Sequence, residues 1–146
     1  MKKLLLVIGV LMIANWGHAQ KKDQAKSIIK DEARISKYHS QEELENMGKG
    51  DLLVLYVERI ETLVNLLPYI AFATKPGVTM SSLGIPNSKD NRSMLEQQFE
   101  ATDDYMEKTK EFQSQILPYS DTDNLTSAIL FYEEILKSLH QYSELH

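Results

Sequence analysis

The chain contains no cysteine, and its single tryptophan is Trp16 near the N-terminus. Without cysteine it cannot form disulfide bonds, carry covalently bound haem or a lipid-modified cysteine, or use a thiol nucleophile. Disulfides are the usual reinforcement of small exported proteins. The stability of this chain must therefore come from its hydrophobic core alone.

Motifs that carry recognisable chemistry are also missing. The sequence has no Gly-x-Ser-x-Gly, no glycine-rich phosphate loop and no Glu-x-x-His, the pair that ferritin-like di-iron bundles require. Adjacent carboxylates such as Asp103–Asp104 and Glu133–Glu134 are typical of solvated faces of amphipathic helices. We therefore predict no catalytic residue, no metal site and no cofactor.

The chain has fewer positive than negative side chains, with 16 Lys and Arg against 21 Asp and Glu, which gives a net charge of −5. Nucleic acids and anionic membranes both select basic surfaces, so neither is an expected partner. A basic protein partner, or simple solubility, fits this balance better.

The longest uncharged apolar run lies at the N-terminus, where residues 1–19 have the three parts of a secretory signal peptide. Lys2 and Lys3 precede an apolar run over residues 4–14, and Gly17 and Ala19 are the small residues that a signal peptidase reads. The run is about half the ~20 residues that span a bilayer. We expect cleavage after Ala19 and a periplasmic or secreted protein, residues 20–146, with a net charge of −7 once Lys2 and Lys3 are lost.

Residues 51–72 form the most apolar segment of the remaining chain, and we expect it to be the central helix. Two adjacent apolar stripes indicate that the helix is covered on two sides. The first comprises Leu53, Val57, Ile60, Val64, Leu67 and Ala71, and the second Leu52, Tyr56, Leu63, Leu66 and Ile70. The polar arc comprises Glu58, Glu61, Thr62 and Asn65. Three charged residues at 58, 59 and 61 argue against a membrane span, at about 2.5–3.5 kcal/mol each in a bilayer.

Helical periodicity recurs on both sides of this segment and predicts helices over residues 24–47, 51–74, 92–117 and 122–145. Ser40 begins a capping-box pattern, so the first helix either breaks near His39 or continues through it. Pro68 predicts a kink or restart in the second helix. The pattern predicts an all-α protein, a single domain built as a four-helix bundle of two helical hairpins joined by a long middle loop.

The middle loop, residues 75–91, carries four apolar side chains that a solvated linker would not need. These are Val78, Met80, Leu83 and Ile85. They either cap the end of the bundle or form a partner-binding surface.

Seven tyrosines are the other unusual feature of the composition. Each could bury its ring and direct its hydroxyl to the surface. Alternatively, some of them line an interior pocket widened by the proline kink. The residues of that predicted pocket are Tyr56, Val64, Asn65, Pro68, Tyr105 and Tyr132.

Together these features favour an exported, non-enzymatic helical protein that binds another protein in an accessory, inhibitor or immunity-type role. The alternative is a small-molecule or metal-binding bundle with its interior site near Pro68. Neither reading involves nucleic acid or stable membrane insertion after signal cleavage.

Overall fold

The computed structural model describes residues 25–144, so the predicted signal peptide lies outside the described residues. Within this range the protein is all-α, without a β-strand. Its α-helices are α2 (Gln41–Glu45), α3 (Lys49–Leu66), α4 (Lys89–Ile116) and α5 (Thr122–Glu144). Short 3-10 turns cover η2 (Leu67–Tyr69), η3 (Ser81–Leu83) and η4 (Leu117–Tyr119).

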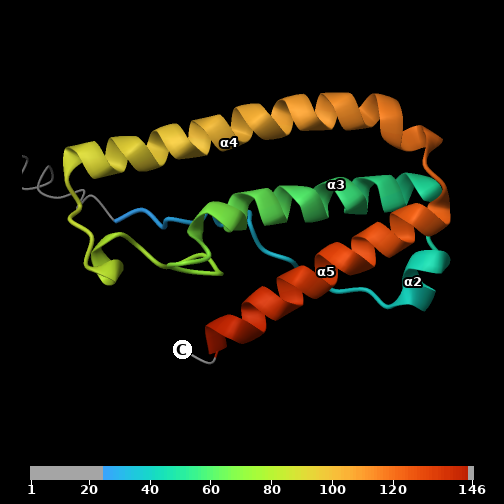
Figure 1. The fold of residues 1–146 in the computed structure, drawn as a ribbon, viewed down its shortest axis with the longest axis horizontal. Coiled ribbons are helices and arrows are strands. Elements are labelled where there is room, and N and C mark those ends of the chain that lie inside the picture. The colour runs from blue at the N-terminus through green and yellow to red at the C-terminus, as the bar shows by residue number, and fades with distance from the viewer. Residues whose placement is uncertain (1–24, 145–146) are drawn as a thin grey trace, which may run out of the picture.

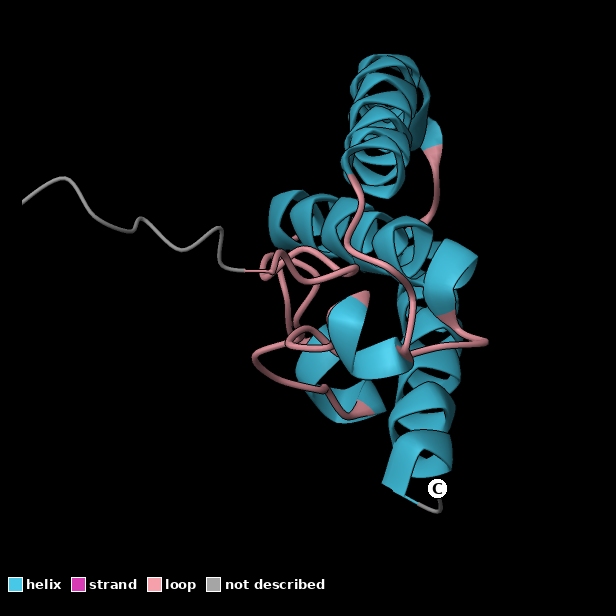
Figure 2. Ribbon diagram, turned by 90° about the vertical axis from the view of Figure 1, so that its left-hand side faces the viewer, coloured by secondary structure: helices cyan, strands magenta, loops and turns pink. Residues whose placement is uncertain are grey.

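Helix α3 is the middle layer, with α4 and α5 on opposite sides of it (Figure 1). Helices α3 and α5 run in the same general direction, and α4 runs the opposite way. The most extensive packing is between α3 and α5, and α2 packs on α5. Figure 2 shows the same order, with α4 standing apart at the top. Although η4 joins α4 directly to α5, the two helices do not lie against each other as a simple hairpin would.

The predicted helix over residues 24–47 is wrong, because in its described part, residues 25–47, only α2 is helical. Residues 25–40, which precede α2, form an irregular segment that we call the strap. In this strap Ser27 makes an isolated antiparallel bridge with Thr79, and the neighbouring residues Ile28 and Ile29 are both buried. Successive side chains point in different directions, so two adjacent buried residues indicate a segment that is enclosed on more than one side rather than a helix with one buried face. The first of the two predicted hairpins is consequently not formed.

The capping box at Ser40 is confirmed. Its hydroxyl accepts a hydrogen bond from the Glu43 backbone N–H at 3.2 Å, and a Glu43 carboxylate oxygen accepts from the Ser40 backbone N–H at 2.8 Å. The break near His39, one of the two sequence-based alternatives, is therefore the one that occurs.

The central helix is shorter than the predicted range of residues 51–74. It begins two residues earlier, after Gly48, and its α-helical part ends at Leu66. Pro68 lies in η2, where its missing N–H is tolerated in the first turn of a new helical segment. The predicted restart at the proline is therefore observed as a change from α to 3-10 geometry.

The fully buried side chains of α3 lie on one face, and the α3 members of the first predicted stripe, such as Val57 and Val64, are only partly buried. Leu52, Leu63 and Leu66 are buried, whereas Leu67 of the first predicted stripe is 55% exposed. Thr62, assigned to the polar arc, is buried. The buried face also contains Arg59, which is only 1% exposed.

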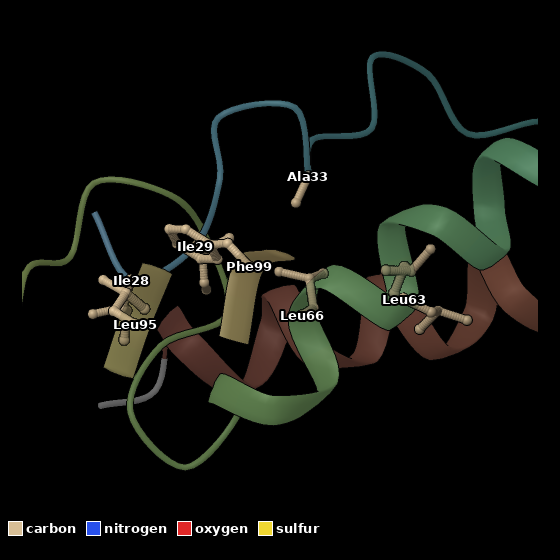
Figure 3. Packing of buried hydrophobic residues seen from close by; sticks show 8 residues of the cluster. Ile28, Ile29, Ala33, Leu63, Leu66, Leu95 and Phe99 are labelled. Atoms are coloured by element: carbon tan, nitrogen blue, oxygen red, sulfur yellow. The ribbon is translucent and has the colours of Figure 1, made fainter. Parts of the chain in front are cut away.

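The core consists of two apolar clusters along α3 and α5. The larger lies near the C-terminal end of α3, where side chains from the strap, α3 and α4 meet (Figure 3). Its buried members are Ile28, Ile29, Ala33, Leu63, Leu66, Leu95, Phe99 and Leu136. The smaller contains Leu44, Leu52, Leu55, Leu125 and Ile129. Along α3, Arg59 lies between the residues that belong to the two clusters, and along α5 Glu133 does the same.

Candidate functional site: an apolar groove and a buried ion-pair layer

An apolar groove of about 300 Å³ lies between the middle loop and the first turns of α4. Its apolar base includes Ile28 and Leu95, which are almost fully buried. Its most exposed lining residues are Phe72 and Met94, at 56% and 67%. The lining residues are Ile28, Tyr69, Phe72, Met80, Leu83, Ile85, Asn91, Met94, Leu95 and Gln98.

Local hydrogen bonds give the loop side of this groove its shape. The Ile28 N–H donates to the Val78 carbonyl at 2.8 Å, and the Gly77 N–H donates to the Ser27 hydroxyl at 3.0 Å. Gly84 ends η3 with φ of 74°, a left-handed conformation that glycine adopts without strain. The loop is therefore tied down on the strap.

The four predicted loop residues divide between two roles. Met80, Leu83 and Ile85 line the groove, and the first two also pack against the larger core cluster. Val78 packs against that cluster and is not part of the groove lining. Sequence reasoning missed Phe72 and Met94. For Phe72 the available signal was that it lies on neither of the two apolar stripes assigned to residues 51–72.

The structure places the residues of the predicted interior pocket in different surroundings. Tyr56 and Tyr132 are in contact, with their ring centroids 5.6 Å apart. Burial of the Tyr132 hydroxyl, and to a smaller extent its interaction with Tyr56, raise the pKa of Tyr132 to about 12. Tyr105, expected to face inward, is 56% exposed on α4, and Pro68 is exposed. Val64 is half-buried on α3.

Asn65 borders a separate polar cleft of about 490 Å³ between α3, α4 and the strap. Ion pairs cross this region from strap to helix, with Lys26 2.8 Å from Glu96 and Lys30 2.5 Å from Asp103. Both ammonium groups also lie over the Phe99 ring, at 5.3 and 5.2 Å from its centroid. These contacts fasten the strap to α4.

A buried ion-pair layer connects α3, α5 and the strap between the two apolar clusters. The Arg59 Nε donates to Glu133 Oε1 at 2.9 Å, and the two side chains are 1% and 0% exposed. The His39 backbone N–H donates to Glu133 Oε2 at 2.6 Å, and the His39 ring Nδ1 lies 2.9 Å from Oε1. Glu133 was expected on a solvated helix face, so that expectation is wrong.

The remaining Arg59 donors are also used. Nη2 donates to the Lys37 carbonyl at 2.7 Å, and Nη1 donates to Glu58 at 2.8 Å. Burial raises the pKa of the Glu133 carboxyl, but hydrogen bonds from His39 and Arg59 lower it by more, so the net pKa is below its ordinary value. The layer is an ionised, mutually satisfied cluster that holds the strap in place.

Next to this layer, the Tyr38 hydroxyl lies 2.8 Å from His140 Nδ1, and Lys137 Nζ lies 5.3 Å from the centre of the Tyr38 ring. Burial and the nearby Glu133 charge raise the pKa of Tyr38. This extends the polar contacts between strap and α5.

Among residues 25–144, no group of three or more His, Cys, Asp or Glu side chains is placed to hold a metal ion. In the same part of the chain, none of the helices has the combination of length and apolar character needed to cross a membrane.

The protein is thus all-α and carries an open apolar groove on its surface. No protein-family model matches the chain, and comparison with curated proteins and with solved structures gives no significant match either.

Proposed function

We propose that this is an exported, non-enzymatic protein that binds another protein through the apolar groove, in an accessory, inhibitor or immunity-type role. The observation that carries the proposal is the groove itself, with Phe72 and Met94 exposed at 56% and 67%. Exposed apolar side chains around a concavity are typical of interaction sites. The N-terminal sequence of residues 1–19 supports export.

The attachment of the loop supports a binding role because it reduces the entropy lost on association. Hydrogen bonds from the strap hold residues 77 and 78, and Leu83 packs against the core. A groove that is already formed needs little ordering when a partner arrives. The exposed Phe72 and Met94 provide the apolar contact.

Site-specific photo-crosslinking in cells tests this function. A photoreactive phenylalanine analogue replaces Met94 in one variant and Tyr119 in another. Tyr119 is a matched surface position because it is 88% exposed and does not line the groove. We expect a crosslinked protein of discrete mass from position 94 and none from position 119.

A second pair of variants checks that the groove is responsible. Met94→Asp, introduced into a chain with the probe at position 72, should abolish the crosslink, whereas Phe131→Asp should leave it unchanged. Phe131 is similarly exposed, at 62%, but lies on α5 outside the groove. No crosslink from either groove position, or equal crosslinks with Met94→Asp, contradicts the proposal. Val78 is unsuitable for this test because it also packs in the core.

A further inference from the structure

The groove lacks negative charge although the protein as a whole is acidic. The chain has 21 Asp and Glu residues, but none lines the groove, whose polar lining consists of Tyr69, Asn91 and Gln98. The excess negative charge of the chain predicted a basic partner. At the groove, that prediction has no local support.

One end of the groove is instead positive. Met80 and Leu95 also line a smaller adjoining hollow, together with Lys26, Arg92 and a single carboxylate, Glu96. That carboxylate already pairs with Lys26 at 2.8 Å. The net charge of this hollow is therefore positive.

Arg92 carries the charge that remains. Its Nη1 donates to the Asn87 carbonyl at 2.8 Å, and no carboxylate among the described side chains, residues 25–142, lies within ion-pair distance of it. Arg92 also belongs to the first turn of α4, where the helix dipole adds positive potential and Asp90 contributes one negative charge. An occupant with a carboxylate at this end is favoured electrostatically.

Building on the proposed function, we infer that the groove binds an amphipathic helix of the partner protein, with a carboxylate beside its apolar face that pairs with Arg92. Apolar side chains spaced one helical turn apart suit an open groove with exposed apolar lining residues. Met80 and Met94 are adaptable contacts for such a face. The acidic surface elsewhere disfavours an anionic membrane as the occupant.

Two model peptides test this inference on the purified protein. Both are capped helices of about 16 residues with the same leucine stripe. One carries Glu beside the stripe and the other carries Lys, and binding is followed by fluorescence anisotropy. We expect the Glu peptide to bind about tenfold tighter at low salt, with the difference shrinking as salt screens the pair.

Matched variants assign the preference to Arg92. Arg92→Glu should reverse it, whereas Lys108→Glu, the same charge change at an exposed position further along α4, should preserve it. Met94→Asp should weaken both peptides. Circular dichroism checks that each variant keeps its helical content.

Other occupants appear as distinct outcomes. Equal affinity for the two peptides, or no binding of either, overturns the inference. Dimerisation in sedimentation equilibrium that Met94→Asp abolishes, or binding to phosphatidylglycerol vesicles that Arg92→Glu abolishes, assigns the groove to a second copy or to lipid and also overturns it. A groove-dependent crosslink at position 94, combined with no peptide preference, leaves the proposed function standing and removes only the inferred partner chemistry.

Discussion

At the scale of single residues, the pair Arg59–Glu133 has the greatest structural consequence. Both side chains are inaccessible to solvent, and both make several hydrogen bonds. Removing charges from water costs several kcal/mol per ion, and only complete pairing offsets that cost. The pair therefore adds little net stability, and its main effect is to fix how α3, α5 and the strap are arranged.

Removing one partner should be costly because it leaves the other charge buried. We expect Glu133→Gln to lower the free energy of unfolding by about 3 kcal/mol. The control is Glu134→Gln, a neighbouring carboxylate whose side chain is 68% exposed, which should change stability by less than about 0.5 kcal/mol. Urea unfolding followed by circular dichroism measures both. A Glu133→Gln effect as small as that of the control would contradict the assigned burial.

Acid should destabilise the protein through the same carboxylate. The pKa of Glu133 lies below its ordinary value of 4.5, so the unfolded chain binds its proton at higher pH than the folded chain does. Stability from this group is present above the unfolded pKa and is lost as pH falls from about 4.5 through the folded pKa.

Urea midpoints between about pH 6 and about pH 3 measure this effect. We expect a shallower loss of stability in Glu133→Gln than in wild type, and an unchanged profile in Glu134→Gln. Glu133→Gln should still lose some stability in acid, because a second carboxyl, Glu43, also has a lowered pKa in the folded protein. Its pKa is about 2, chiefly because of its hydrogen bond with Lys37. Identical profiles for wild type and Glu133→Gln would exclude Glu133 as the source.

At the scale of elements, local chemistry at the ends decides where helices and turns begin and stop. Ser40 caps the N-terminus of α2, Ser88 caps the N-terminus of α4, and Gly84 caps the end of η3 in the left-handed region. These are short-range effects, which explains why the capping box could be predicted from four consecutive residues.

Two glycine substitutions should have opposite signs. Gly84→Ala should cost about 1 kcal/mol, because its φ of 74° is strained for alanine. Gly50→Ala should stabilise by about 0.5–1 kcal/mol, because it lies in the first turn of α3 and a Cβ there meets nothing within 4 Å. Thermal and urea unfolding measure both. The same sign for the two variants would contradict the backbone assignment at one of them.

At the scale of the whole molecule, the helices are unequally supported. Helix α3 lies between α4 and α5 and contributes to both core clusters. Helix α4 is buried only through Leu95, Phe99, Thr102 and Met106, all before its last ten residues. Its attachment to the strap adds exposed ion pairs, which contribute little each.

Hydrogen exchange should reveal this difference. We expect backbone amides of residues 52–66 to be the most protected, and those of residues 107–116 to exchange at least about tenfold faster, because few buried contacts oppose local opening there. Mass spectrometry of peptic fragments provides the measurement. Equal protection of the two segments would mean that α4 is held along its whole length.

Part of this architecture could be predicted because it depends on local pattern. Helical periodicity identified α3, α4 and α5, although the second predicted helix, which was expected to run to residue 74, is α-helical only to Leu66, just before the restart predicted at Pro68. The strap was missed because Ile28, Ile29 and Ala33 look like one face of a helix. Their burial depends on the middle loop and α4, which are distant in sequence.

For the candidate site, the sequence supplied three of the groove residues, Met80, Leu83 and Ile85, because apolar side chains in a polar loop are unusual. Phe72 and Met94 could not be assigned, since exposure of an apolar residue depends on which helices cover it. Tyr105 was placed inside for the same reason and lies outside.

The sequence by itself therefore determined the all-α class, the principal helices and the absence of disulfides, because periodicity, capping and composition act over short distances. Only the tertiary structure decided which apolar faces are covered and that Arg59, Glu133 and His39 meet in the interior. An ion pair can be buried only where separate elements supply all of its partners, and no local pattern encodes that meeting.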